Sequence, residues 1–138
     1  MFLTVFCLMG MVRVLILILP FKWIAQRLGH HGIESSPEED SAHRETAGKI
    51  GRVIETISRY TPWESKCLVQ GITGKILMRK MGISNTLYLG VKKNKKNELV
   101  AHAWLRVGPA TITGRRGREE FKVVACFSDR MNDKKQEM

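Results

Sequence analysis

The chain has 138 residues, of which 43% are hydrophobic, and its formal net charge is +10 at pH 7. This length predicts one domain with a buried core, spanning 1–138, and excludes two full domains. The three cysteines are widely spaced and odd in number, so they indicate neither a disulfide framework nor a metal site, and no cofactor is expected. Such cysteine usage is typical of a reducing cytoplasm.

Residues 1–29 are expected to form apolar helices. Residues 1–19 are apolar apart from a threonine, a glycine and Arg13. Because a central arginine costs about 2.5 to 3.5 kcal/mol on insertion scales, this run predicts a core or interfacial helix and not a clean membrane span. A secretory signal is not predicted, since no small-residue cleavage site follows. Pro20 restarts a second helix, and 1–29 can contact a membrane surface peripherally.

A polar linker and then the core helices, within 40–81, follow. The linker histidines and His43 lack the spacing of zinc ligands, so no metal site is predicted. The first core helix is amphipathic and should pack beside the next one. Its apolar stripe consists of Ala47, Ile50, Val53, Ile54, Ile57 and Tyr60.

The second core helix carries Cys67 near its start. The Thr-Pro-Trp-Glu run at 61–64 supplies a cap, a first-position proline and a capping-box glutamate, which place Cys67 in the second turn. A start at Ser65 would place it in the first turn, where the helix dipole favours a thiolate most. Met81-Gly82 ends the helix. Both starts stay open, and so does the ordinary alternative of a buried structural cysteine.

Strands are expected within 84–128, at 86–92, 98–107, 110–113 and 121–127. Turn residues at 94–97 and 108–109 predict an antiparallel meander. N-terminal helices packed against a C-terminal antiparallel sheet define the α+β class.

His102 lies in a strand of strict alternation. Between residues 98 and 107 apolar side chains alternate with a mixed set that includes His102 and Trp104, so His102 leaves the sheet on the less apolar face. Trp104 on that face can form a wall of a site and order the imidazole, or it can simply pack in the core.

Five short segments occur in a compatible order: Pro62-Trp63, Cys67-Leu68, Met81-Gly82-Ile83, Leu87-Tyr88-Leu89-Gly90-Val91 and Ala101-His102-Ala103-Trp104. Together they resemble the leader peptidase of lasso-peptide biosynthesis, a member of the transglutaminase-like cysteine-protease superfamily. The resemblance implies a papain-like α+β fold, in which Cys67 attacks a leader-peptide carbonyl and His102 shuttles the proton. Trp63 and Trp104 become candidates for substrate binding.

One departure concerns the third catalytic position. The family places an aspartate on the strand after the histidine, whereas Thr113-Gly114 stands there in this chain. If 108–109 forms the tight turn, Thr113 would lie across from Trp104 and offer its hydroxyl to the His102 ring. The alternatives, each also an ordinary surface group, are Glu119, Glu120 and Asp129.

The resemblance also implies partners. Fused family members carry a winged-helix leader-binding domain ahead of the protease, and no such segment fits before Thr61. The chain is therefore expected to be the protease half of a split cytoplasmic system. Its partners would be a lasso precursor peptide, a separate leader-binding protein and a lasso cyclase.

Two other functions stay open. The positive charge concentrates in 92–96 and 115–118, which fits a basic module for nucleic acid or anionic membrane. Both segments lack interleaved aromatic residues, so solvated loops are favoured and a nucleic-acid partner is not predicted. The same segments can receive an acidic leader segment. The other function is acyl transfer to an amine by the same Cys-His pair.

Overall fold

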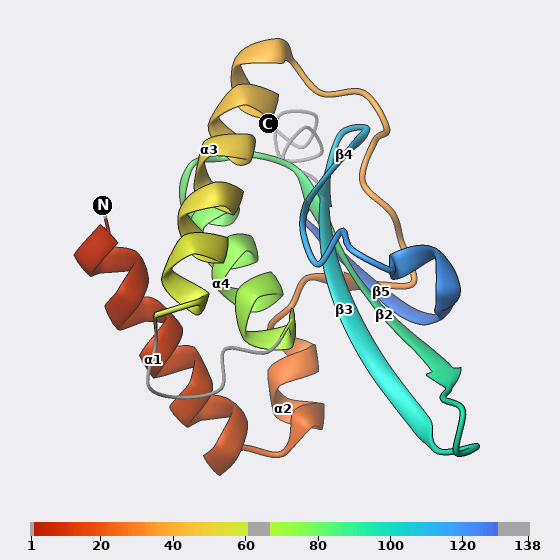
Figure 1. Ribbon diagram of the computed structural model, residues 1–138. Helices are drawn as coiled ribbons and strands as arrows, with labels where there is room; N and C mark the ends of the chain where they lie inside the picture. The colour runs from red at the N-terminus through yellow and green to blue at the C-terminus, as the bar shows by residue number, and fades with distance from the viewer. Residues whose placement is uncertain (1, 61–66, 130–138) are drawn as a thin grey trace.

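The computed structural model describes residues 2–60 and 67–129, and it places a layer of helices on one antiparallel sheet (Figure 1). The α-helices are α1 (Phe2–Ile18), α2 (Phe21–Gln26), α3 (Ser41–Ser58) and α4 (Cys67–Lys80). The strands are β1 (His30–His31), β2 (Asn85–Lys93), β3 (Leu99–Val107), β4 (Ala110–Thr113) and β5 (Lys122–Asp129), with a 3-10 turn η1 (Arg118–Glu120) before β5. The predicted α+β class is confirmed.

The strand order is β1-β5-β2-β3-β4, and every pairing is antiparallel. The predicted meander is wrong at its last step, because β5 pairs with β2 and not with β4. Most of β2 is buried, and a buried strand needs hydrogen-bonding partners along both of its edges. The linker prediction is also wrong at His30–His31, which form the edge strand β1, and the His31 ring stacks on Phe127.

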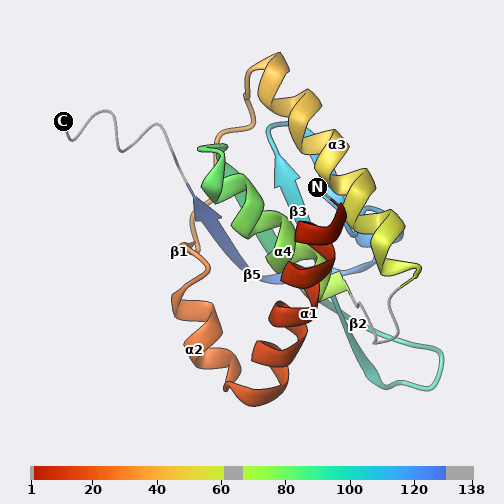
Figure 2. The ribbon, with the colours of Figure 1, turned by 90° about the vertical axis from the view of Figure 1, so that its left-hand side faces the viewer.

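Helix α4 occupies the middle of the helical layer, against β3 on one side and against α1 and α3 on the other (Figures 1 and 2). Two glycines allow this close approach to the sheet. A Cβ at Gly71 would lie 2.7 Å from the Leu87 side chain, and one at Gly74 would lie 2.8 Å from that of Leu105. Gly82, with φ at +69°, follows the helix as predicted. The close packing fixes the start of α4 beside β3.

Helix α3 packs beside α4, as its apolar stripe predicts. Asp40 caps it by accepting hydrogen bonds from the backbone N–H groups of Ala42 and His43. The stripe is buried along the helix, but Tyr60 is wrongly included in it. Tyr60 is 81% exposed because the helix ends at Ser58, before that face would return to the core.

Helices α1 and α2 bury only part of their apolar surface. Helix α1 turns Val5, Met9 and Val12 into the core, and Pro20 precedes α2 as predicted. The remaining large apolar side chains form an exposed surface, termed the apolar face, made of Phe2, Leu3, Phe6, Met11, Val14, Leu15, Leu17, Ile18, Leu19, Phe21 and Trp23. Within the described residues, no helix combines the length and the hydropathy that crossing a bilayer would require.

Candidate active site

Cys67 is the first described residue of α4, and its side chain is half-buried. Its Sγ accepts a hydrogen bond of 3.3 Å from the backbone N–H of Ala103 on β3. That donor would remain in place for a thiolate sulfur after the proton has left. The two alternative helix starts, and Trp63 with them, fall on residues 61–66 and lie outside the described part of the chain.

His102 precedes Ala103 on β3 and leaves the strand on the opposite face. Its ring stacks on Trp104, with centroids 5.8 Å apart, and packs against Phe121 at 4.9 Å. Gly90 on β2 is the cross-strand partner of His102 on β3, and it leaves room for these rings. A Cβ there would lie 2.9 Å from both the Trp104 ring and the Phe121 side chain. Aromatic packing therefore restricts the imidazole on the side of the sheet away from the helices.

A hydrogen bond to the backbone of Gly114 also orients the His102 ring. Nε2 of His102 lies 2.7 Å from the carbonyl oxygen of Gly114. A carbonyl oxygen only accepts hydrogen bonds, so Nε2 carries the hydrogen, and Nδ1 of the neutral ring keeps a lone pair and can act as a base. Gly114 has φ at +67°, and a Cβ there would clash with the carbonyl oxygen of Ala103. This position therefore requires glycine.

The predicted position of Thr113 is wrong. A register shift between Leu105 and Arg106 pairs Thr113 with Leu105 instead of Trp104. A one-step change of register moves a side chain to the other face of a sheet, so Thr113 faces α4 and is buried near Gly74. Its hydroxyl has no hydrogen-bond partner among the described residues. The backbone of the next residue contacts the ring instead.

The three acidic alternatives lie elsewhere. Asp129, at the end of β5, forms ion pairs with Arg79 at 2.9 Å and with Lys75 at 3.2 Å. Glu120 pairs with Lys92, and Glu119 is exposed on η1. Backbone carbonyls are present at every residue, so no residue type or motif could point directly to Gly114. The absence of an aspartate at Thr113-Gly114 was an indirect signal.

Lys75, which pairs with Asp129, is a buried cation and is only 1% exposed. Its Nζ donates to Asn85 Oδ1 at 2.8 Å and to the carbonyl oxygen of Phe127 at 3.1 Å, besides its ion pair with Asp129. Burial lowers the pKa of Lys75 to about 8, although Asp129 opposes the shift. This cluster joins α4 to the sheet and lies outside the groove that holds Cys67 and His102.

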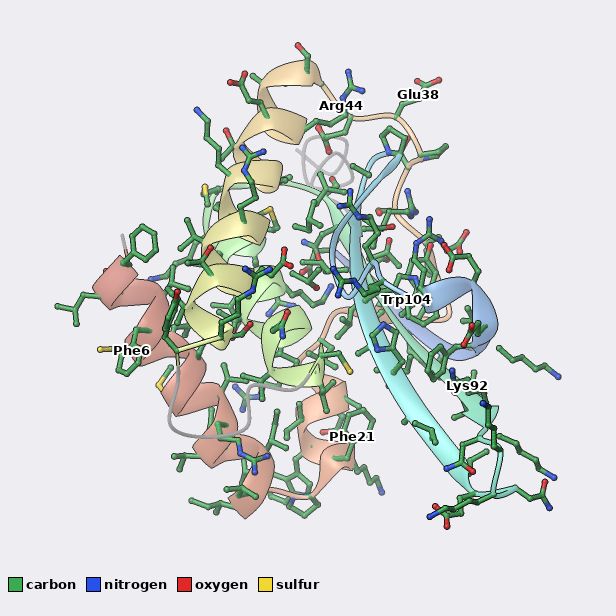
Figure 3. The ribbon with its side chains drawn as sticks, in the orientation of Figure 1. Phe6, Phe21, Glu38, Arg44, Lys92 and Trp104 are labelled. Atoms are coloured by element: carbon green, nitrogen blue, oxygen red, sulfur yellow. The ribbon has the colours of Figure 1, made fainter. Side chains whose placement is uncertain are left out.

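Trp104 supports the ring and does not bound the groove. It is buried, and it stacks on Tyr88 at 5.6 Å as well as on His102. Figure 3 shows Trp104 and Lys92 beside the sheet, while Phe6 and Phe21 lie on the helical side. The packing alternative for Trp104 therefore agrees better with the structure than substrate contact does.

The other cysteines and histidines have different surroundings. Cys7 is exposed, although its apolar surroundings in the sequence are typical of a core position, and burial raises the pKa of the half-buried Cys126. His43 Nδ1 lies 2.9 Å from Glu39 Oε1, and with Asp40 these side chains come close enough for metal ligands, although no zinc-ligand spacing was predicted here. Asp40 already caps α3, which accounts for its position.

Cys67 and His102 line one groove with a volume of about 720 Å³, between α3 and the segment from β4 to Arg116. Strand β4 pairs with β3 only from Leu105 onward, so the β3 edge beside Ala103 faces this groove. Cys67 comes from the helical side and the His102 side chain from the other face of β3, and both residues line the groove. The groove is large enough for a peptide segment.

Comparison with known proteins matches residues 15–126 to the family model described as transglutaminase-like superfamily. The matched segment includes α4 and β3, and with them Cys67, His102 and Gly114. Neither the curated proteins nor the solved structures gave a match.

Proposed function

The chain belongs to the transglutaminase-like superfamily, and from this premise we propose that it is a cysteine peptidase that removes the leader from a ribosomally made lasso precursor. The observation that carries the chemistry is the common groove of Cys67 and His102, with the ring oriented by Gly114. The lasso substrate rests on the resemblance of residues 62–107 to the leader peptidases.

In the proposed mechanism, His102 Nδ1 takes the proton of Cys67, and the sulfur attacks the carbonyl carbon of the last leader residue. The tetrahedral intermediate collapses by breaking the peptide C–N bond, and His102 returns the proton to the leaving amine. The core peptide departs with a free N-terminal amine, and the leader stays on Cys67 as a thioester. Water, deprotonated by His102, then releases the leader as a carboxylic acid and restores the thiol.

The proposed setting of this reaction follows the same resemblance. A separate leader-binding protein would bring the precursor to Cys67, and a cyclase would use the released amine. The leader-binding protein is expected to raise the cleavage rate, because it increases the effective concentration of precursor at the groove. The proposed compartment is the cytoplasm.

We further propose that the apolar face of α1 and α2 rests on the anionic surface of a membrane. The turn between α1 and α2 and the turn between β2 and β3 lie at the same end of the molecule in both ribbon views (Figures 1 and 2). Lys95 and Lys96 in the second turn and Lys93 at the end of β2 are all exposed. Exposed apolar side chains complement the acyl boundary of a membrane, and exposed lysines complement its anionic headgroups.

The function is tested by incubating a lasso precursor with the protein and the leader-binding protein, and by following the products by mass spectrometry. Cleavage should yield two products whose masses together equal the precursor plus one water. Folded Cys67→Ala and His102→Ala variants should lose several orders of magnitude in rate, whereas Cys126→Ala, which removes a thiol outside the groove, should stay active.

Two outcomes would count against this function. Cleavage at the wild-type rate by folded Cys67→Ala would exclude Cys67 as the nucleophile. A product in which the leader carbonyl is joined to an added amine, in preference to water, would assign the same groove to acyl transfer.

A further inference from the structure

Four arginines line the groove that contains Cys67 and His102. Arg52 and Arg59 come from α3, and Arg115 and Arg116 follow β4. All four are exposed. Glu55 is the one acidic side chain among the described residues that line the groove, and it pairs with Arg59 at 3.2 Å. Positive charge therefore exceeds negative charge by three along this groove.

The arginines stand on two walls that tight packing holds in place. In the α3 wall, a Cβ at Gly51 would clash with the carbonyl oxygen of Ile112, so the helix lies directly against β4 (Figure 1). In the other wall, Arg115 and Arg116 lie between Gly114 and Gly117, whose φ angles are +67° and +76°. The turn that presents the Gly114 carbonyl to His102 thus also directs the arginine pair.

We infer that this groove selects a peptide segment with glutamate or aspartate residues close to the scissile bond. The inference rests on the proposed peptidase function, since it assigns the substrate class of the same site. Guanidinium groups on both walls can pair with carboxylates of an extended peptide that passes over Cys67.

A nucleic acid fits this groove less well. Single-stranded bases are held by stacking on aromatic side chains, in addition to phosphate contacts. Among the lining residues that the structure describes, His102 has the only ring, and that ring already packs against Trp104 and Phe121. The lining therefore supplies charge for an anionic chain without a stacking surface for bases.

The test measures binding in the Cys67→Ala protein, so that no turnover occurs. The probes are a fluorescent glutamate-rich peptide and its counterpart with glutamine at the same positions, and binding is followed by anisotropy. The glutamate peptide should bind more tightly. Exposed ion pairs are individually weak, so replacing both Arg115 and Arg116 by Gln should weaken its binding by about three- to tenfold. Raising the salt from about 50 mM to about 200 mM should reduce the preference.

A matched control removes the same amount of charge elsewhere. The double variant Lys95→Gln, Lys96→Gln also loses two positive charges, but in the β2–β3 turn outside the groove, and it should leave the peptide affinity unchanged. Equal binding of the two peptides, or equal losses in the two double variants, would overturn the inference. So would displacement of the glutamate peptide by a much more tightly bound oligothymidylate.

Cleavage of a lasso precursor, measured in parallel, separates this inference from the proposed function. The arginine double variant should raise KM and leave kcat unchanged, because the lost contacts serve binding. Cleavage without a glutamate preference would refute the acidic substrate class and keep the peptidase. A glutamate preference without any Cys67-dependent cleavage would refute the peptidase function and keep the acidic class of bound peptide.

Discussion

Nε2 of His102 donates a 2.7 Å hydrogen bond to the carbonyl oxygen of Gly114, a backbone group in the Thr113-Gly114 segment where the resemblance implies an aspartate. A neutral carbonyl fixes the tautomer and the direction of the ring, as a carboxylate would. It stabilises an imidazolium less, because charge-assisted hydrogen bonds are roughly twice as strong as neutral ones. In the proposed mechanism Cys67 and His102 would thus act as a dyad, with the main chain of Gly114 orienting the ring.

An aspartate at position 114 should therefore lower the proposed activity. Gly114→Asp would place a Cβ against the carbonyl oxygen of Ala103 and force a side chain into left-handed backbone. The Gly114 carbonyl would move away from His102, and the cleavage rate should fall by at least about tenfold, the value of one hydrogen bond to a charged group. Steady-state kinetics of precursor cleavage measures this loss.

Gly117 provides the control for backbone strain. It has a similar φ of +76°, but nothing lies within 4 Å of the position that a Cβ would take. Gly117→Asp should pay the same left-handed penalty and keep most of the activity. A Gly114→Asp protein that is as active as Gly117→Asp, or more active than wild type, would show that the carbonyl does not orient His102.

The Thr113 hydroxyl should be dispensable. It is buried without a hydrogen-bond partner among the described residues, and valine has nearly the same shape. Thr113→Val should leave cleavage unchanged and raise the free energy of unfolding by about 1 kcal/mol, because an unpaired buried hydroxyl disappears. Thr73→Val, which removes another such hydroxyl on α4, should stabilise similarly. A large loss of activity confined to Thr113→Val would restore Thr113 as a catalytic residue.

Local patterns made much of this fold predictable. The alternation around His102 predicted β3 to within one residue, and the apolar stripe predicted that α3 packs beside α4, because each pattern depends on neighbours in sequence. The pairing of β5 with β2 depends on contacts between distant segments, and so does the burial of Lys75. No local period encodes such contacts, and the meander prediction failed at that point.

The candidate site divides in the same way. Cys67 and His102 were found from their residue types and from motifs around them, and the structure brings both to one groove. Thr113 was misplaced because a shift of register between Leu105 and Arg106 leaves no mark in the sequence. The backbone carbonyl of Gly114 has no side-chain signature at all, so only the fold could reveal its contact with the ring.

Lys75 should make stability depend on pH in the alkaline range. Its pKa is about 8 in the folded protein, against an ordinary value of 10.5, because burial disfavours the charge. Between these two values the unfolded chain binds more protons, so the contribution of Lys75 to the free energy of unfolding rises with pH, by about 3 kcal/mol in all. Below pH 8 the lysine is charged in both states, and the full cost of burying that charge is present.

Urea denaturation of wild type and Lys75→Met across this range tests the assignment. The stability of wild type relative to the variant should increase from pH 8 to pH 10.5. Lys80→Met, which removes an exposed lysine from the same helix, controls for the loss of a surface charge. Parallel stability curves for wild type and Lys75→Met would contradict the shifted pKa.

The apolar face should bind anionic vesicles, because α1 presents leucine, isoleucine and phenylalanine side chains to solvent and the lysine-bearing β2–β3 turn lies at the same end of the molecule as the α1–α2 turn. Leu17 on this face is 67% exposed. Leu17→Glu should weaken binding to phosphatidylglycerol vesicles, measured by co-sedimentation, by at least about tenfold, because a carboxylate at the acyl boundary opposes insertion. Val124→Glu introduces the same charge at a 58% exposed apolar position on β5 and should have little effect. Equal losses in the two variants would indicate a general charge effect. A wild-type dimer that Leu17→Glu converts to monomer, with vesicle binding absent in both, would instead assign the apolar face to a second copy of the chain.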